Sequence, residues 1–151
     1  MADDRERDAI LLIEDTLADQ ELALHELLAH GVTNQVVVAE SGDDALGYLF
    51  GTGRFVDRDV TVQPLLVLLD LEIPGIDGTT VLRRMRADLR TKHLPVIVLT
   101  SSTQDADLMR SYALGAKFAQ KPLRFEWFHT AMNKLGLLPR LALSSSSPAL
   151  R

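Results

Sequence analysis

Five short segments rich in apolar residues recur along the chain, and each gives way to polar residues. They span Ala9–Ile13, Gln35–Ala39, Leu65–Leu69, Pro95–Leu99 and Ala116–Gln120. Continuous apolar runs of this length, such as the third, are typical of strands buried on both faces of a parallel sheet. The pattern therefore predicts five strands.

Segments with helical spacing of apolar positions separate these strands. In the first, Asp19 can cap a helix and Gly31 can end it, with an apolar stripe formed by Leu22, Leu24, Leu27 and Leu28. The same reasoning predicts five helices, over about 19–30, 41–50, 77–89, 104–114 and 124–135. Strands that alternate with single helices indicate an α/β fold with a doubly wound, five-stranded parallel sheet and right-handed crossovers.

Two segments fall outside this alternation. Residues 51–64 are polar and contain glycine, and the segment exceeds the roughly 2–6 residues usual for such connections, which favours a functional or partly ordered loop. The C-terminal residues include four consecutive serines, which cannot bury enough apolar surface to become ordered. We expect one domain over residues 1–137, with its core at 8–137, and a flexible tail over 138–151.

Composition narrows the class of protein. A chain of 151 residues that is 46% hydrophobic can bury a full core as one domain. The absence of cysteine excludes disulfides, thiolate metal sites and cysteine nucleophiles, and fits a cytoplasmic location. The charged N-terminus is unlike a signal peptide, and no apolar run approaches the ~20 residues that span a bilayer. We expect a soluble protein without a membrane segment.

Charge is distributed unevenly. Residues 1–75 hold sixteen acidic and four basic residues, a balance of −12, whereas residues 76–151 hold five acidic and twelve basic residues, a balance of +7. These halves can be two solvated faces of one domain, or two poles that orient a protein partner. The basic residues form no dense patch with interleaved aromatics, so we do not expect nucleic-acid binding.

Chemically useful side chains stand where the predicted strands end. Glu14 and Asp15 follow the first strand, Asp70 follows the third, Thr100 the fourth and Lys121 the fifth. In open α/β sheets, ligands bind just past the carboxyl ends of the strands. Three carboxylates at one edge repel one another and call for a cation, and oxygen ligands suit Mg²⁺. The alternative is that these are unrelated surface acids.

A phosphoryl group bound at this edge would meet Mg²⁺, an ammonium and a hydroxyl. Such positioning and charge neutralisation are what phosphoryl transfer requires. Lys121 and Pro122 also form a strand end with a possible cis peptide bond, although a Lys-Pro pair alone is usually no more than a strand end.

At these motifs the chain resembles a known family, the receiver domains of bacterial two-component response regulators. The resemblance covers about residues 8–137 and is carried by Glu14-Asp15, residues 68–75, Asp77-Gly78, Thr100-Ser101, Gly115-Ala116 and Lys121-Pro122. It implies the flavodoxin-like strand order 2-1-3-4-5.

The resemblance also implies roles for the residues at the strand ends. Asp70 would be the phosphoacceptor, phosphorylated from a phosphohistidine on a sensor histidine kinase. Mg²⁺ would be bound by Glu14, Asp15, Asp70 and the backbone carbonyl of Glu72. Thr100 and Lys121 would contact phosphoryl oxygens.

Two further features follow from the same resemblance. Thr100 and Phe118 match the family's switch pair, in which the hydroxyl moves inward and the aromatic ring follows; plain core packing is the alternative for Phe118. Glu72 departs from the residues common at its position. Its side chain is expected near the phosphate, where it would alter the access of hydrolytic water.

The resemblance extends to partners. The loop over 51–64 is similar to that of phytochrome-associated response regulators, which implies a bacteriophytochrome as the kinase. The first predicted helix, with Thr16, Leu17, Gln20 and Leu24, resembles a kinase-docking surface, or is an ordinary amphipathic helix. We expect a homodimer through the fourth helix, fifth strand and fifth helix, using Tyr112, Phe125 and Trp127.

Three classes of function remain. The first is a phosphoacceptor switch that catalyses its own phosphorylation and dephosphorylation, turns over no diffusible substrate, and acts through protein contacts because no DNA-binding output domain is expected. The second is an interaction module that has lost phosphorylation. The third is a phosphohydrolase with an aspartyl-phosphate intermediate, in which Glu72 would serve as acid and base.

Overall fold

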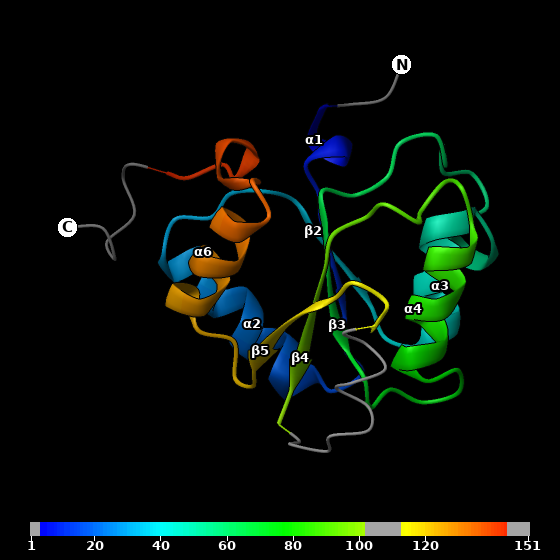
Figure 1. The fold of residues 1–151 in the computed structure, drawn as a ribbon, viewed down its shortest axis with the longest axis horizontal. Coiled ribbons are helices and arrows are strands. Elements are labelled where there is room, and N and C mark those ends of the chain that lie inside the picture. Colours follow the sequence, from blue (N-terminus) through cyan, green and yellow to red (C-terminus); the bar gives the residue numbers. More distant parts are fainter. Residues whose placement is uncertain (1–3, 102–112, 145–151) are drawn as a thin grey trace.

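A computed structural model describes residues 4–101 and 113–144. Five parallel strands form one sheet in the order β2-β1-β3-β4-β5, which confirms the predicted topology (Figure 1). Each strand lies within one residue of its predicted position: β1 Ile10–Ile13, β2 Val36–Ala39, β3 Leu66–Asp70, β4 Val96–Thr100 and β5 Lys117–Gln120.

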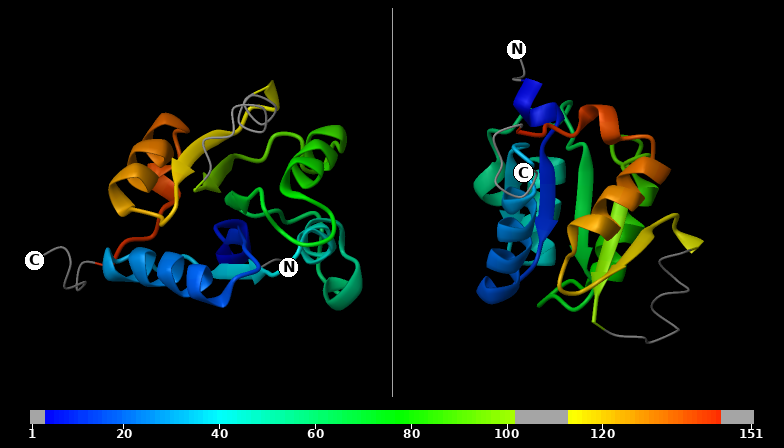
Figure 2. Two further views of the ribbon diagram at one scale, coloured as in Figure 1. Left: turned by 90° about the horizontal axis from the view of Figure 1, so that it is seen from below. Right: turned by 90° about the vertical axis from the view of Figure 1, so that its left-hand side faces the viewer.

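Helices cover both faces of the sheet (Figure 2). On one face lie α2 (Leu17–Ala29) and α6 (Phe125–Lys134), and on the other α3 (Gly42–Phe50) and α4 (Gly78–Ala87). These are four of the five predicted helices; the remaining one, over 104–114, falls mostly outside the described residues. A short helix α1 (Asp4–Arg7), which the sequence analysis did not predict, precedes β1. No helix in the described ranges has the length and apolar character needed to cross a lipid bilayer.

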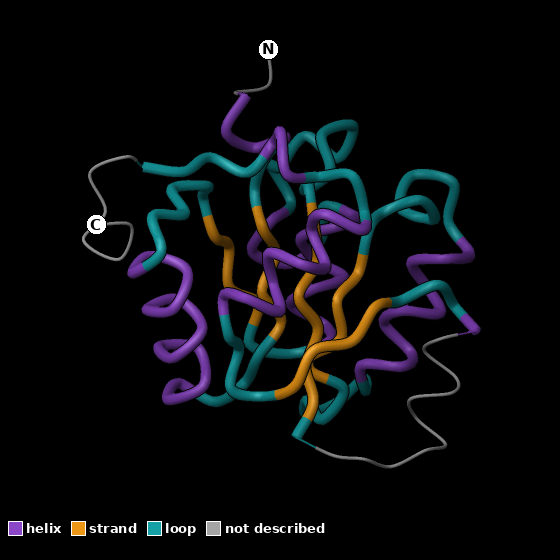
Figure 3. Tube along the Cα trace, turned by 60° about the vertical axis from the view of Figure 1, so that its left-hand side comes forward, coloured by secondary structure: helices purple, strands orange, loops and turns teal. Residues whose placement is uncertain are grey.

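The strands run through the middle of the molecule between helices (Figure 3), and the central strands are buried because they separate two cores. In β3, Leu66 and Leu68 join the cluster that packs against α2 and α6, whereas Val67 and Leu69 join the cluster under α3 and α4. All five residues of β3 are buried. Side chains alternate between the faces of a strand, so a strand with helices on both sides needs a continuous apolar sequence. This requirement explains the pattern that the sequence shows.

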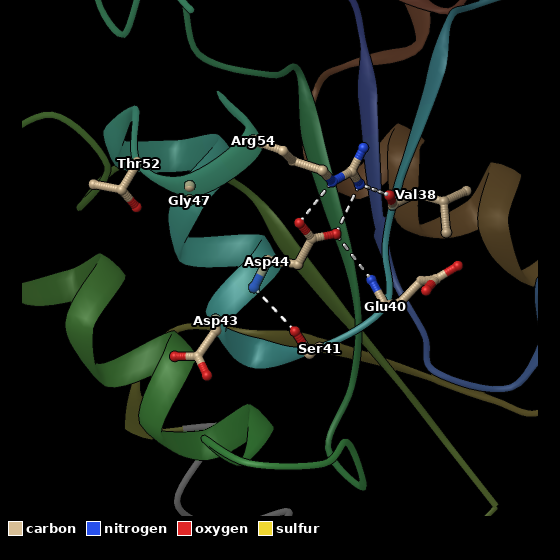
Figure 4. Close-up of a pocket in the computed structure, with 9 residues that line it drawn as sticks. Val38, Glu40, Ser41, Asp43, Asp44, Gly47, Thr52 and Arg54 are labelled. Carbon is tan, nitrogen blue, oxygen red and sulfur yellow. Dashed lines mark hydrogen bonds and ion pairs between the residues drawn. The ribbon is translucent and has the colours of Figure 1, made fainter. Parts of the chain in front are cut away.

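The long connection over 51–64 is held against the fold by two arginines. Arg54 donates to both carboxylate oxygens of Asp44, at 2.8 and 2.7 Å, and to the Val38 carbonyl at 2.9 Å (Figure 4). Arg58 donates to the Tyr48 carbonyl at 2.6 Å and lies over its ring. The segment contains the short 3-10 helix η1 (Gly53–Phe55). These contacts tie the segment to α3 and β2, which does not fit a partly ordered loop; the other expectation, a functional loop, stays a prediction.

The chain beyond the predicted domain end at 137 continues to pack against the domain. It forms the 3-10 helix η2 (Leu138–Arg140), and Leu143 then pairs with Val32 as an antiparallel bridge. Backbone hydrogen bonds on either side of this pair, and the burial of Leu141, hold the segment through residue 144. Residues 145–151 of the predicted flexible tail lie outside the described residues.

We expect Gly78→Ala to destabilise the fold by about 1–3 kcal/mol, the usual range for forced overpacking. A Cβ at this position would lie 2.6 Å from the Leu71 Cα and 2.7 Å from the Asp70 carbonyl oxygen, so the backbone after β3 would have to shift. Urea unfolding measures the change. Thr80→Ala, two residues further along α4, is the control, and equal effects of the two substitutions would contradict the explanation.

Candidate functional site

Three carboxylates meet at the carboxyl ends of β1 and β3. These strands are neighbours, with Ile13 paired to Leu69, so Glu14 and Asp70 stand side by side at the edge of the sheet. Carboxylate oxygens of Glu14, Asp15 and Asp70 lie within 4.8 Å of one another. The structure therefore brings together the acidic residues that the sequence analysis selected.

Lys121 enters this group from the end of β5. Its Nζ lies 2.6 Å from Glu14 Oε2 and 2.8 Å from Asp70 Oδ2. Its backbone N–H donates to the Thr100 carbonyl at 3.0 Å, which fixes the residue beside the end of β4. The Lys121–Pro122 peptide bond is cis. One ammonium thus bridges two carboxylates that come from two other strands.

Burial sets the electrostatics of the site. Glu14 is 2% exposed and Asp70 5% exposed. Burial raises the pKa of Glu14, and the hydrogen bond from Lys121 offsets only part of this effect. Burial lowers the pKa of Lys121, but its hydrogen bonds to Asp70 and Glu14 raise it by more, so the pKa stands above its ordinary value. The two carboxylates therefore favour the cationic form of Lys121. Asp15 is exposed, so the cluster of three carboxylates is open to solvent at this residue.

Backbone and amide donors orient the carboxylates. The Glu72 N–H donates to Asp70 Oδ1 at 3.0 Å, and the Thr16 N–H donates to Glu14 Oε1 at 3.1 Å. The Gln20 amide donates to the Glu14 carbonyl at 2.7 Å. Gln20 is buried in this contact, so it does not belong to the exposed kinase-docking surface on which the sequence analysis placed it.

The donor set fits a hard divalent cation. Glu14, Asp15 and Asp70 offer only oxygen ligands, and with Lys121 they leave a formal charge of −2 at the site. Oxygen-only sites of this kind select Mg²⁺ or Mn²⁺ over softer metals. The Glu72 side chain is exposed, and metal binding by its backbone carbonyl stays a prediction.

The predicted switch pair lies beside this group. Thr100 ends β4, next to the strand that ends in Asp70. Phe118 lies in β5 opposite Val98, and its half-buried ring packs against the core under α3 and α4. These positions suit a Thr100 hydroxyl near Asp70 and a Phe118 ring on the neighbouring strand. The coupled movement of the two side chains stays a prediction.

The predicted interface residues differ in exposure. Phe125 stacks on His30, the residue that follows α2, with ring centroids 4.5 Å apart, so its ring packs within the domain. Trp127 is 41% exposed and borders a hollow of about 380 Å³ with Lys117, Phe118 and Lys134. Tyr112 lies outside the described residues. Among the predicted interface residues that the structure describes, Trp127 therefore presents an aromatic surface to solvent.

The sequence analysis missed one member of the site. Asp19 lies 3.3 Å from the Lys121 ammonium, measured from its Oδ2, in the first turn of α2. It had been assigned only as a helix cap. The sequence does contain a signal for this position of Asp19. The residue comes four positions after Asp15, in the first turn of the helix that follows β1.

Comparisons with known proteins agree with this geometry. A family described as "Response regulator receiver domain" matches residues 10–133. The bacteriophytochrome response regulator AtBRR is 41% identical, with a TM-score of 0.81 over 92% of this chain and 98% of that one. The probable methanogenesis regulatory protein FilR2 of Methanothrix harundinacea is 38% identical over 78% of this chain and 74% of its own length.

A third relative is response regulator Rcp1 of Synechocystis, whose solved structure is a Mn²⁺-bound form. That structure is 27% identical to this chain, with a TM-score of 0.71 over 91% of this chain and 99% of that one. Its cation is of the class that suits the oxygen ligands described above.

We expect Lys121→Met to destabilise the metal-free protein by about 2–3 kcal/mol, because Glu14 and Asp70 would lose their shared cation while remaining buried. Added Mg²⁺ should recover part of the loss, since ligand binding to the folded state stabilises it. Thermal unfolding with EDTA and with Mg²⁺ measures both effects. Lys117→Met, at the other end of β5, is the matched control. A loss no larger than in the control would refute the electrostatic account.

Proposed function

The chain belongs to the response regulator receiver domain family of two-component systems, and from this we propose that it is a cytoplasmic phosphoacceptor switch. Asp70 would accept a phosphoryl group from a sensor histidine kinase. The observation that carries the proposal is the ammonium of Lys121, which lies 2.8 Å from Asp70 Oδ2 and 2.6 Å from Glu14 Oε2, beside the carboxylate of Asp15.

The chemistry is in-line phosphoryl transfer to a carboxylate. An Asp70 oxygen attacks the phosphorus, a P–O bond forms, and the N–P bond of the phosphohistidine breaks as the imidazole leaves with its electron pair. Lys121 balances charge on a phosphoryl oxygen, and the Thr100 hydroxyl donates to another. Glu14, Asp15 and Asp70 would hold Mg²⁺, which would supply further charge neutralisation. The product is an acyl phosphate on Asp70.

We infer that the kinase is a bacteriophytochrome. The structural relatives AtBRR and RtBRR, which are 41% and 35% identical to this chain, are both described as bacteriophytochrome response regulators. Three leucines of α2 are exposed, Leu17 at 66%, Leu22 at 52% and Leu28 at 67%, and these suit contact with the helices of a kinase. The output would be a change of protein contacts, with no turnover of a diffusible substrate.

Intact mass spectrometry after incubation with Mg²⁺ and acetyl phosphate tests the phosphoacceptor. We expect the wild type to gain one phosphoryl group and Asp70→Asn to gain none, because a neutral amide lacks the nucleophilic carboxylate oxygen. Should neither protein gain mass, with acetyl phosphate or with a phytochrome kinase, the interaction module replaces the switch. Continuous release of inorganic phosphate from phosphate esters would favour the phosphohydrolase.

We also propose a homodimer through the predicted fourth helix, β5 and α6, of which the predicted fourth helix lies mostly outside the described residues. The exposed ring of Trp127 and the adjoining hollow are the described features that support this face. We expect Trp127→Ser to shift the light-scattering mass of the phosphorylated protein towards that of the monomer at micromolar concentration. Leu28→Ser removes an even more exposed apolar side chain, 67% against 41% for Trp127, from α2 and should leave the dimer intact. A monomeric wild type, with and without phosphorylation, would contradict the proposal.

A further inference from the structure

Asp19 gives Lys121 a third carboxylate that lies outside the metal-binding group. Its Oδ2 is 3.3 Å from the ammonium nitrogen, and its side chain is 39% exposed, against 3% for Glu14 and 7% for Asp70. Within the described part of the chain, the carboxylate cluster that could hold a metal comprises Glu14, Asp15 and Asp70 and does not include Asp19. Asp19 therefore touches the lysine from the outer side of the site.

The position of Asp19 is fixed by its neighbour in α2. Gln20 is buried and donates its amide to the Glu14 carbonyl at 2.7 Å, so the first turn of α2 is tied to the end of β1. An acid in this turn also interacts favourably with the helix dipole, which is the ordinary structural explanation for such a residue. The dipole alone does not explain why the carboxylate contacts the ammonium of Lys121, a residue 102 positions away in sequence.

A cation bound by Glu14, Asp15 and Asp70 would compete with Lys121 for the same oxygens. The ammonium now contacts Glu14 Oε2 and Asp70 Oδ2, two of the three groups that would ligate the metal. A divalent ion among these carboxylates also repels an ammonium a few ångströms away. Lys121 then needs another counter-ion, and it must stay close enough to reach a phosphoryl group on Asp70.

We propose that Asp19 is this counter-ion: it receives the ammonium of Lys121 when the carboxylates of the site bind Mg²⁺. Asp19 is accordingly a positioning residue that acts through Lys121. The inference rests on the proposed function, in that it takes Glu14, Asp15 and Asp70 to be the metal ligands and Lys121 to be the phosphoryl partner.

The test is a double-mutant cycle read by calorimetric Mg²⁺ titration of the full chain. We expect Asp19→Asn to raise the Kd for Mg²⁺ about fivefold, because the displaced ammonium loses its counter-ion, a loss of the size found for partly exposed ion pairs. In the Lys121→Met background, where there is no ammonium to displace, the same substitution should change the Kd less than about twofold. Asp19→Glu should restore most of the affinity.

Glu21→Gln is the matched control, because it removes an exposed acid of the same helix, two residues after Asp19. An Asp19→Asn effect equal to this control, or equal in both lysine backgrounds, would overturn the inference, as would a wild type that does not bind Mg²⁺. A role confined to the helix predicts a lower Tm with an unchanged Kd. The proposed function fails separately: a wild type that gains no phosphoryl group leaves the Mg²⁺ cycle readable.

Discussion

Repulsion among carboxylates that the sheet forces together is the constraint around which the site is organised. The parallel register of β1 and β3 places Glu14 and Asp70 side by side, and both are almost completely buried. Charges removed from water are unfavourable unless they are paired, and here a single ammonium, that of Lys121, is shared between them. The other features of the site serve to place these three groups.

Several local features keep this arrangement in place without adding charge. Asp70 Oδ1 accepts from the Glu72 N–H, and Glu14 Oε1 accepts from the Thr16 N–H, so each carboxylate keeps its second oxygen for the lysine or a metal. Gly78 lets α4 begin against the backbone that follows β3. The two cores hold the strands on which these residues stand. The two hydrophobic cores thus stabilise the sheet edge at the ends of β1 and β3, where the clustered carboxylates would be unfavourable on their own.

The sequence predicted the sheet and the acidic edge well, because both follow from short-range patterns. A strand buried on both faces must be continuously apolar, and the residue after it must lie at the edge; Leu66–Asp70 satisfies both conditions. Contacts made across the fold were harder to predict. The burial of Gln20 against the Glu14 carbonyl, the docking of Leu143 on Val32 and the reach of Asp19 to Lys121 depend on tertiary packing, which periodicity does not report.

The charge of the site explains why its lysine needs more than one partner. Glu14, Asp15, Asp70 and Lys121 sum to −2, so Mg²⁺ would bring these groups to neutrality and weaken the pull on the ammonium. Phosphorylation of Asp70 would replace the single negative charge of its carboxylate by the two charges of an acyl phosphate, and the attraction on the ammonium would return at a new position. A lysine that takes part in both Mg²⁺ binding and phosphoryl transfer must be held only weakly between these two steps. Asp19, half in solvent and 3.3 Å away, offers a contact that is weak enough to be exchanged for a phosphoryl oxygen.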